Sequence, residues 1–572
     1  MHPGAIGGII GLGSLYKILE LKGGGAKIAQ MLGGRRIHPN TTEPGERRLL
    51  NVVEEMALAS GVPVPPVYVM DKETSINAFA AGYSPGDAVI SVNRGTIDYL
   101  SRDELQGIMA HEFSHILHGD MRLNIRLIGI LNGILIIAIL GFYMMRWGFV
   151  ASVVGGRSRG KGGNPGVALL VIGIAALVVG SIGLFFGRLI KAAVSRQREY
   201  LADSSAVQFT RNPDGIGSAL QKIGGLVYGS KMLTPEAESA SHMFFGSAFK
   251  SSSFSLWATH PPLHDRIKRI QPSWDGRFPK TTRYQEPAAK AEVVPTSQPG
   301  KFRTPMQQMG GVMDAIPLEP VLVLGAMGEI RSENVDYSHN LIEGMPPGLL
   351  EAIHDSFSAR AVVFAMLLDD DEEICSNQLQ IISDNEGDPT ENETRKLAPL
   401  VNQSGRESRL PIVEMVQSSL TEMSEPQYQR FKKTIDELVK ADGKIDLFEF
   451  MLQRVLIDHL DRQFYGKKPP AMKYQALNAV MTEVGGLISC LAHVGHTDAD
   501  ETQDAYNQAT ETLSGQAPDL MSKRDCSLQV VSQSLDKLAQ SSPAIKKQVL
   551  NAALTCIAAD GKVTVAEAEL VR

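Results

Sequence analysis

The sequence has little of what marks a secreted protein or a nucleic-acid binder. Its 572 residues include only four cysteines, none in a CxxC pair: Cys375, Cys490, Cys526 and Cys556. Such wide spacing indicates reduced thiols in a cytosolic compartment rather than a disulfide framework. The chain also lacks an excess of positive charge, because its formal net charge is −7. A broad basic surface is therefore absent, and we expect no nucleic-acid partner.

Charged side chains are absent from two long apolar runs. These are residues 127–145 (LIGILNGILIIAILGFYMM) and 166–186 (GVALLVIGIAALVVGSIGLFF). A helix of about 20 mainly apolar residues crosses a hydrocarbon core of about 30 Å, and a helical hairpin buried in a protein core rarely stays uncharged for so long. Both runs therefore predict transmembrane helices. The connection at 146–165 has no acidic residue and is rich in glycine, as is typical of an exposed loop.

Basic residues flank the two runs unevenly. The connection carries Arg146, Arg157, Arg159 and Lys161, whereas the outer flanks carry Arg122, Arg126, Arg188, Lys191, Arg196 and Arg198. The positive-inside rule places the side with more Lys and Arg in the cytoplasm. We therefore expect both outer flanks, and with them most of the chain, to face the cytoplasm.

Apolar spacing predicts a helix and two short strands ahead of a further helix. Residues 42–61 place apolar side chains three and four positions apart, as in an amphipathic helix. Residues 64–70 (VPPVYVM) and 88–92 (AVISV) are typical of short strands. The next helix begins near Ser101, where Glu104 three positions later completes a capping box. We therefore expect a small sheet in front of this helix.

This helix carries the segment His111-Glu112-Phe113-Ser114-His115. Because 3.6 residues make one turn, His111 and His115 lie on one face and can both offer a nitrogen to one metal ion. Zinc at such a site lowers the pKa of a bound water from about 15.7 to near 7, and a neighbouring carboxylate such as Glu112 can take its proton during attack on a peptide carbonyl. By itself, however, a five-residue pattern is only moderately specific.

A third protein ligand is required, because a catalytic zinc site has three protein ligands and a water. Glu199 and Asp203 lie at i and i+4 on a helix expected to start where the second apolar run ends, so both can face the first helix. Glu199 is the candidate ligand, and Asp203 can accept the other N–H of a ligand histidine. Without further context, two acidic residues at this spacing are more common on an exposed helix face.

Several stretches, in the same order and spacing, resemble the HtpX and Ste24 type of membrane zinc metallopeptidase. They are SINAFAAG at 75–82, LSRDELQGIMAHEFSHILHGD at 100–120, the two apolar runs, SRQREYLADSSAV at 195–207 and THPPLHDRI at 259–267. The resemblance covers roughly 42–270 and is highly specific. It implies a gluzincin-like core with one Zn²⁺ held by His111, His115 and Glu199, and with Glu112 as general base.

The resemblance also implies a substrate-binding strand and further polar groups near the metal. Residues 77–82 would form an edge strand that pairs with an extended peptide through the main chain, using Asn77, Ala78, Phe79 and Ala80. His260 would approach the metal as a donor to the developing oxyanion or as a gate, and Arg266 would be a structural or oxyanion partner. Alternatively, His260 is a turn residue before two prolines and Arg266 a surface charge.

Other polar residues near these motifs are weaker candidates. His118 is a possible further ligand at i+7 from His111, but the glutamate already completes the set. Asp120 is expected to organise the helix end near Gly119. For His242 and His264 we favour a structural role.

The remainder of the chain predicts a second, helical unit. Residues 278–317 begin with a stretch rich in Pro, Lys, Thr, Ser and Gln, which is typical of a linker, and residues 318–572 show apolar residues three and four apart. Ala441-Asp-Gly-Lys-Ile with Glu449, and Ala559-Asp-Gly-Lys-Val with Glu567, repeat one spacing but lack the oxygen ligands of an EF-hand. They resemble the turn of TerB-like helical domains, which implies a partner-binding or regulatory module.

These observations predict a mainly α protein with a small β-sheet: a zincin-like membrane metallopeptidase core and a separate all-α C-terminal domain. We expect an apolar, glycine-rich segment at 1–41, a metallopeptidase domain at 42–277, a linker at 278–317 and a TerB-like domain at 318–572. Members of the resembled family carry further spans ahead of the catalytic region, whereas here only the short apolar stretch at 4–16 remains. The number of spans therefore stays open, as does whether the chain is a fragment.

The expected function is that of a zinc-dependent endopeptidase in the inner (cytoplasmic) membrane, with its catalytic and C-terminal domains facing the cytoplasm. Its partners would be protein or peptide substrates, the lipid bilayer and proteins that bind the C-terminal helices. Membrane or misfolded proteins would be its substrates, in protein quality control. The alternatives are a non-enzymatic membrane scaffold whose helical domain binds partners, and a narrow protease that processes CAAX peptides.

Overall fold

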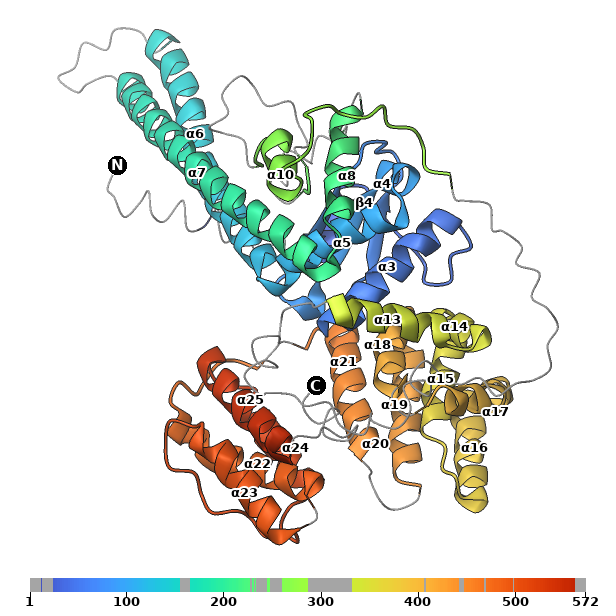
Figure 1. The fold of residues 1–572 in the computed structure, drawn as a ribbon. Coiled ribbons are helices and arrows are strands. Elements are labelled where there is room, and N and C mark those ends of the chain that lie inside the picture. Colours follow the sequence, from blue (N-terminus) through green and yellow to red (C-terminus); the bar gives the residue numbers. More distant parts are fainter. Residues whose placement is uncertain are drawn as a thin grey trace. The chain divides into compact units, whose positions relative to one another are not determined.

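Two compact units make up the chain in the computed structural model (Figure 1). The model describes residues 12, 24–154, 165–226, 229–230, 232, 244–246, 260–285, 332–405, 408–441, 447–467, 470–496 and 498–560. The N-terminal unit comprises residues 1–57 and 65–287, and the C-terminal unit comprises 58–64 and 288–572. The architecture confirms the expected fold class, mainly α with a small sheet and a separate helical C-terminal region.

The sheet of the N-terminal unit has four strands in the order β1-β2-β4-β3. Their bounds are β1 Arg35–Arg36, β2 Val67–Met70, β3 Ala78–Ala81 and β4 Val89–Asn93. β2 runs parallel to β4, and β3 runs antiparallel to β4 and forms one edge. All residues of β2, β3 and β4 are buried, including the polar Ser91 and Asn93 of β4.

Prolines shorten the first of the two strands expected from the sequence. The strand expected at 64–70 begins only at Val67, because Pro65 and Pro66 have no N–H to give to a neighbouring strand. The carbonyl of Pro66 still accepts a hydrogen bond from the N–H of Ile90, at 3.1 Å. The strand expected at 88–92 is β4, shifted by one residue.

The N-terminal unit also contains shorter helices. They are α2 Gly24–Met31, α3 Pro44–Ser60, α4 Arg94–Tyr99, α8 Pro213–Gly225 and α10 Leu263–Ile270. A hydrophobic cluster joins α2 to the sheet, with Ile28 and Leu32 packed among Tyr68, Phe79 and Phe244. The sheet is therefore held firmly against this helix.

α5 (Arg102–Leu117) begins with the expected capping box. The hydroxyl of Ser101 accepts a hydrogen bond from the N–H of Glu104 at 3.3 Å, and Glu104 Oε2 accepts one from the N–H of Ser101 at 2.8 Å. The helix ends at Leu117, and Gly119 two residues later has a φ of +71°, in the left-handed region that glycine adopts without strain. α5 packs against α7 and α8 and touches β3, so it lies at the centre of the N-terminal unit.

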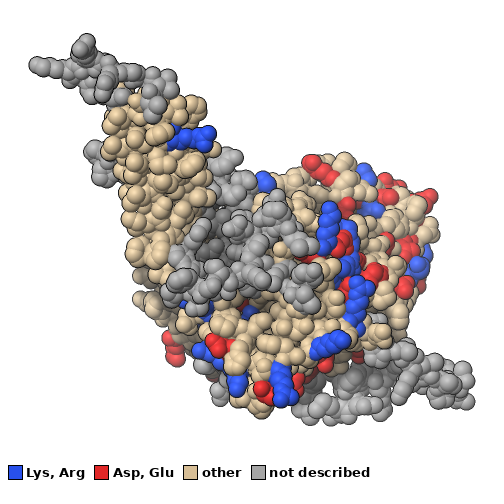
Figure 2. All heavy atoms as spheres, turned by 90° about the horizontal axis from the view of Figure 1, so that it is seen from above, with Lys and Arg blue, Asp and Glu red and all other residues tan. Residues whose placement is uncertain are grey.

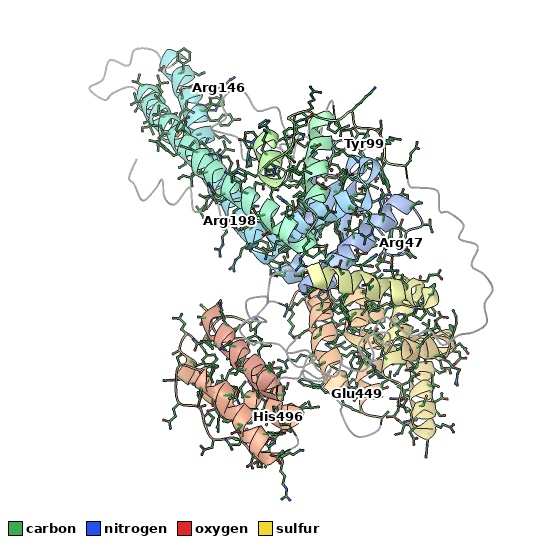
Figure 3. All side chains as sticks on the ribbon, viewed as in Figure 1. Arg47, Tyr99, Arg146, Arg198, Glu449 and His496 are labelled. Atoms are coloured by element: carbon green, nitrogen blue, oxygen red, sulfur yellow. The ribbon has the colours of Figure 1, made fainter. Side chains whose placement is uncertain are left out.

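The two expected membrane spans belong to helices that are much longer than a bilayer requires. Residues 127–145 lie within α6 (Asp120–Val154), and residues 166–186 lie within α7 (Pro165–Thr210). Figure 2 shows the protruding hairpin with an almost uncharged surface, and many of its large apolar side chains are exposed, among them Phe142, Trp147, Val171 and Phe186. An exposed apolar surface of this kind fits lipid contact. In Figure 3 Arg146 lies toward the far end of the hairpin and Arg198 toward its base.

Glycines hold α6 and α7 together. Along α7, Gly166, Gly173 and Gly180 recur every seven residues, and a Cβ on any of them would overlap the main chain of α6. Gly141 and Gly148 on α6 meet the main chain of α7 in the same way. A seven-residue repeat keeps one seam facing its partner, and small residues allow close approach where lipid removes the hydrophobic drive for helix pairing.

The C-terminal unit is all-helical. The helices are α13 Ser332–Gly344, α14 Pro347–His354, α15 Ser358–Met366, α16 Glu372–Glu386, α17 Asp388–Gln403, α18 Arg409–Leu420, α19 Glu425–Val439, α20 Leu447–Leu452, α21 Asp458–Tyr465, α22 Met481–Gly495, α23 Ala499–Glu511, α24 Leu528–Leu538 and α25 Pro543–Ile557. Their apolar residues form two clusters, one in α13–α21 and one in α22–α25. The repeated stretches at 441–445 and 559–563 lie mostly outside the described residues, so their likeness to TerB-like domains stays a prediction.

A third helix is apolar and long enough to cross a membrane, but its surroundings differ. In Leu477–Gly495, 67% of the apolar window is buried inside the protein, against 22% in Gly133–Ser152 and 17% in Pro165–Thr210. Val484, Ile488 and Leu491 of this helix pack in the core of α22–α25. We therefore interpret it as a core helix and the other two as the membrane hairpin.

The stretch expected to start the linker packs on the N-terminal unit up to Gln285. The ring of Phe278 lies 5.2 Å from that of Trp274, and the N–H of Tyr284 donates to the carbonyl of Asp98 at 2.8 Å. Residues 286–331 lie outside the described part of the chain.

The close packing of α6 and α7 at their glycines predicts that a single added methyl group destabilises the protein at some positions and not at others. Gly173→Ala should destabilise the detergent-solubilised protein by about 1–3 kcal/mol, because its Cβ overlaps the main-chain nitrogen of Met145. Gly183→Ala is the matched control on the same helix, since its Cβ meets a side-chain methyl group of Ile134, at 3.0 Å, and no main chain. The thermal unfolding temperatures of the two variants are compared. Equal temperatures would contradict the close packing of α6 and α7 at these glycines.

Candidate metal and catalytic site

Three side chains from two helices converge at the base of the hairpin. His111 and His115 come from α5 and Glu199 from α7. The two Nε2 atoms lie 3.2 Å apart, and Glu199 carboxylate oxygens lie 3.8 Å from that of His111 and 3.6 Å from that of His115. One potential ligand atom from each residue lies within 4.8 Å of the other two, so these residues could hold a metal ion.

The surroundings of the two imidazoles fit a bound cation. Each Nδ1 faces a carboxylate, so the proton of each neutral ring resides on Nδ1 and the lone pairs of the two Nε2 atoms point into the site. Two such lone pairs beside a carboxylate repel one another in a buried site unless a cation lies among them. Tetrahedral zinc, with bonds of about 2.0 Å, separates two nitrogen ligands by about 3.3 Å. The observed Nε2 separation of 3.2 Å agrees with this spacing.

Asp203 lies beside the first histidine. Its Oδ1 lies 3.0 Å from Nδ1 of His111, one turn of α7 beyond Glu199. Arg266 of α10 holds the same carboxylate through two hydrogen bonds, from Nε at 2.8 Å and from Nη2 at 2.7 Å. The guanidinium is fully buried and its Nη1 lies 3.4 Å from Glu199 Oε2. Arg266 therefore contacts both the ligand carboxylate and the orienting carboxylate, rather than solvent.

Asp120 lies beside the second histidine, a contact that the sequence interpretation did not anticipate. Its Oδ2 lies 2.8 Å from Nδ1 of His115, and Arg198 of α7 forms an ion pair with its other oxygen. We expected Asp120 to organise the helix end, but it is the first residue of α6 and turns back onto His115 across the break at Gly119. The sequence signal for this contact was a carboxylate that follows a glycine shortly after the second histidine.

Glu112 lies fully buried beside these residues. It is 1% exposed, and burial raises its pKa to about 7, with a further rise from the charge of Glu199 and an opposing effect from His115. A carboxyl group with a pKa near neutrality can both take up and return a proton. In contrast, burial lowers the pKa of His111 to about 4, so its imidazole is neutral and available as a ligand.

His260 joins the site from the segment before α10. Its Nδ1 lies 3.0 Å from Glu199 Oε2, and its side chain is buried. The structure thus places His260 beside the ligand carboxylate, as the sequence interpretation expects, while Thr259 lies outside the described residues.

The residues expected to bind substrate form the edge strand, but two of them are already engaged. Ala78 and Ala80 belong to β3, and Ala80 lies with His115 and Glu199 along one pocket. The amide nitrogen of Asn77 donates to the carbonyls of Ser230 and Gly246, at 2.8 and 3.2 Å. The ring of Phe79 packs at right angles on that of Phe244, 5.2 Å away. The side chains of Asn77 and Phe79 therefore contact other parts of the same chain.

The weaker histidine candidates lie apart from the three ligand atoms. His118 Nδ1 lies 2.7 Å from the carbonyl of Ser114, which ties it to its own helix end. His264 is exposed, with its ring 5.4 Å from that of Trp274. His242 lies outside the described residues.

Comparisons with known proteins bear on the same part of the chain. The family model described as peptidase family M48 matches residues 44–273. The chain is 42% identical over 223 residues to a protease HtpX homolog of Caldanaerobacter subterraneus subsp. tengcongensis, covering 39% of this chain and 71% of the relative. It is 37% identical over 264 residues to a protease HtpX homolog of Listeria monocytogenes serotype 4a, covering 46% and 84%. No solved structure matches the chain significantly.

The contact between Asp120 and His115 predicts an effect on metal affinity. Asp120→Asn should weaken metal binding by about 10- to 100-fold, because the amide holds the imidazole less firmly in its ligand tautomer. Asp275→Asn, which neutralises an exposed carboxylate of the same unit, is the matched control and should leave affinity unchanged. Competition with a chromogenic chelator measures both, and equal affinities in the two variants would contradict the orienting role.

Proposed function

This chain belongs to peptidase family M48 and is a membrane-bound metalloprotease of the HtpX type, and we propose that its metal is a single zinc ion held by His111, His115 and Glu199. The observation that carries this assignment is the buried convergence of two Nε2 atoms, 3.2 Å apart, with the carboxylate of Glu199. When bound, zinc would polarise the substrate carbonyl and lower the pKa of a water molecule in the site. Asp203 and Asp120 would keep the two imidazoles in the tautomer that ligates.

Glu112 is the proposed general base. Its burial, which raises its pKa to about 7, suits a group that takes a proton from the attacking water. The same carboxyl group would then give this proton to the leaving amide nitrogen, so that it ends the cycle in its starting state. No other side chain needs to change its protonation.

His260 and Arg266 would assist from the side of α10. His260, whose Nδ1 lies 3.0 Å from Glu199 Oε2, is close enough for an imidazole N–H to donate a hydrogen bond to the oxygen on which negative charge develops. Arg266 gives two hydrogen bonds to Asp203 and a third to the carbonyl of Phe245, which supports a role in holding these groups and not in contacting substrate.

The substrate would bind along β3 as an added strand. Main-chain pairing recognises the backbone of an extended peptide more than its side chains, which favours broad specificity. Ala78 and Ala80 would supply the pairing groups, with Ala80 nearest to the ligands.

The distance between the site and the bilayer supports membrane proteins and misfolded chains as substrates, in protein quality control. Glu199 follows the apolar run 166–186 by 13 residues of one unbroken helix, which is about 20 Å. Asp120 precedes the run 127–145 by about 10 Å on α6. An extended chain of several residues is long enough to cover such distances. Segments that emerge from the membrane would thus reach the site.

The C-terminal unit is the proposed partner-binding or substrate-selecting part. It has its own hydrophobic clusters, and the described N-terminal unit already contains each of the proposed catalytic groups. A separate helical unit of this kind is compatible with regulation and does not contribute to the chemistry.

The separate roles of Glu112 and Glu199 predict different losses of zinc and of activity. Glu112→Gln should retain stoichiometric zinc but lose at least about 100-fold in cleavage, because the base is removed while the ligands remain. Glu199→Ala should lose both zinc and activity, because a ligand is missing. Purified full-length protein in detergent is tested for bound metal by mass spectrometry and for cleavage of casein and of a single-span membrane protein.

Each other outcome of this experiment has a definite meaning. Equal zinc loss in both variants would overturn the separate roles of Glu112 and Glu199. Metal-loaded wild type without chelator-sensitive cleavage would favour the scaffold alternative for this chain. Cleavage confined to CAAX peptides would favour the narrow processing alternative over quality control.

We also propose that the site faces the cytoplasm, because six basic residues flank the hairpin on that side and four lie in its connection. In intact cells a membrane-impermeant maleimide should label a Ser158→Cys variant, whose cysteine lies in the connection, and should leave the native cysteines unlabelled. The unsubstituted protein is the control, and it should become labelled at partly exposed Cys375 and Cys526 only after the membrane is opened. The reverse pattern would contradict this orientation.

A further inference from the structure

The edge of β3 is where a substrate would pair, and one of its residues is already occupied. The N–H of Asn93 in β4 donates to the carbonyl of Asn77, so Asn77 faces the sheet and the next residue, Ala78, faces the open edge. The carbonyl of Ala78 accepts a hydrogen bond from the N–H of Phe245, at 2.7 Å. The N–H of Ala78 donates to the side-chain oxygen of Asn77, at 3.1 Å. Both outward groups of Ala78 are therefore taken within the chain.

The side chain of Phe245 lies against the metal-binding residues. Its ring centroid is 4.8 Å from that of His111, edge to face, and the guanidinium of Arg266 lies 4.6 Å from the ring centre. The carbonyl of Phe245 accepts a hydrogen bond from Nη1 of Arg266 at 2.6 Å, the same nitrogen that lies 3.4 Å from Glu199. Phe245 is fully buried. A substrate residue paired at Ala78 would have to occupy this space.

Its two neighbours anchor the segment to the strand. Phe244 packs its ring on that of Phe79, and the N–H of Gly246 donates to the side-chain oxygen of Asn77 at 3.0 Å. A Cβ at Gly246 would come within 2.6 Å of the Ser230 side chain, so this residue must be small to lie here. Phe244–Gly246 thus bends against the edge and meets it through the hydrogen bond from Phe245 to Ala78, with one ring on Phe79 of β3 and the next on His111.

We propose that Phe244–Gly246 is an internal pseudosubstrate that occupies the substrate-binding edge of β3 and must leave it before an extended substrate can pair at Ala78. The inference rests on the proposed function of β3 and of the three metal ligands. Ala80, beside His115 and Glu199, is the next outward-facing residue, so displacement of the segment would extend the binding edge from one residue to two. Affinity for an extended substrate would then rise in proportion to the fraction of molecules whose segment has left the edge.

A single substitution separates the pseudosubstrate from a purely structural role. Phe245→Ala removes the ring that packs on His111, which weakens the occupied state, so kcat/KM for casein should rise by about tenfold while bound metal stays the same. Phe245→Leu fills more of the same space and should give a smaller rise. Phe209→Ala, which removes a buried ring elsewhere in the N-terminal unit, controls for general loosening and should give no rise.

Inhibitor binding gives a second measurement that does not depend on turnover. An N-blocked dipeptide hydroxamate has to pair with the β3 edge, whereas acetohydroxamate contacts the metal alone. Phe245→Ala should bind the dipeptide compound about tenfold more tightly than wild type and bind acetohydroxamate equally well. A structural role for Phe245 would instead weaken the binding of both compounds.

The outcomes distinguish this inference from the proposed function. If wild type and Phe245→Ala cleave casein at the same rate and bind the dipeptide hydroxamate equally, the pseudosubstrate is overturned and the protease assignment stands. Metal loss or reduced cleavage in both Phe245 variants also overturns it, because the segment then supports the site. If wild type and Phe245→Ala cleave no faster than Glu112→Gln, the proposed function itself fails, and the pseudosubstrate fails with it.

Discussion

The buried pair of Arg266 and Asp203 is the interaction on which the site depends. Glu112, Glu199 and Asp203 bring three carboxyl groups into one water-poor region, and burial disfavours their charged forms. Arg266 supplies a permanent positive charge among them, with two hydrogen bonds to Asp203 and a nitrogen 3.4 Å from Glu199. Removal of the guanidinium would leave Asp203 as an uncompensated buried charge and would release His111. The short segment 260–270, which looks peripheral, therefore sets the electrostatics of the centre.

The continuity of α7 gives the site its location. One helix, Pro165–Thr210, contains the apolar run, the candidate ligand Glu199 and Asp203, which lies beside His111. Because an α-helix is stiff over this length, the position of the hairpin and the position of Glu199 are fixed to each other. Arg198 on the same helix pairs with Asp120 at the start of α6, which connects the second ligand histidine to the base of the hairpin. The geometry of the metal ligands is thus built on the membrane anchor.

Local spacing predicted a large part of this arrangement, and the parts it missed share a cause. The capping box at Ser101, the shared face of His111 and His115, and the i, i+4 relation of Glu199 to Asp203 all follow from the helical repeat within one element. Asp120 was missed because Gly119 breaks the helix, so that its direction cannot be extrapolated from α5. α6 and α7 are longer than the two apolar runs because α6 begins and α7 ends with a charged stretch, which composition does not mark as part of a span.

Phe244–Gly246 had no sequence signal at all, since three residues without periodicity or a polar motif identify neither a strand nor a partner for one. Its presence on β3 nevertheless answers a physical difficulty. An edge strand that recognises main-chain groups accepts any extended chain, and an unpaired edge is also a template for aggregation. Covering Ala78 with the chain's own Phe245 satisfies these groups without adding a barrier at Ala80, where the ligands lie. Selectivity can then come from the ability of a substrate to displace the segment, which favours long, unfolded chains over short peptides.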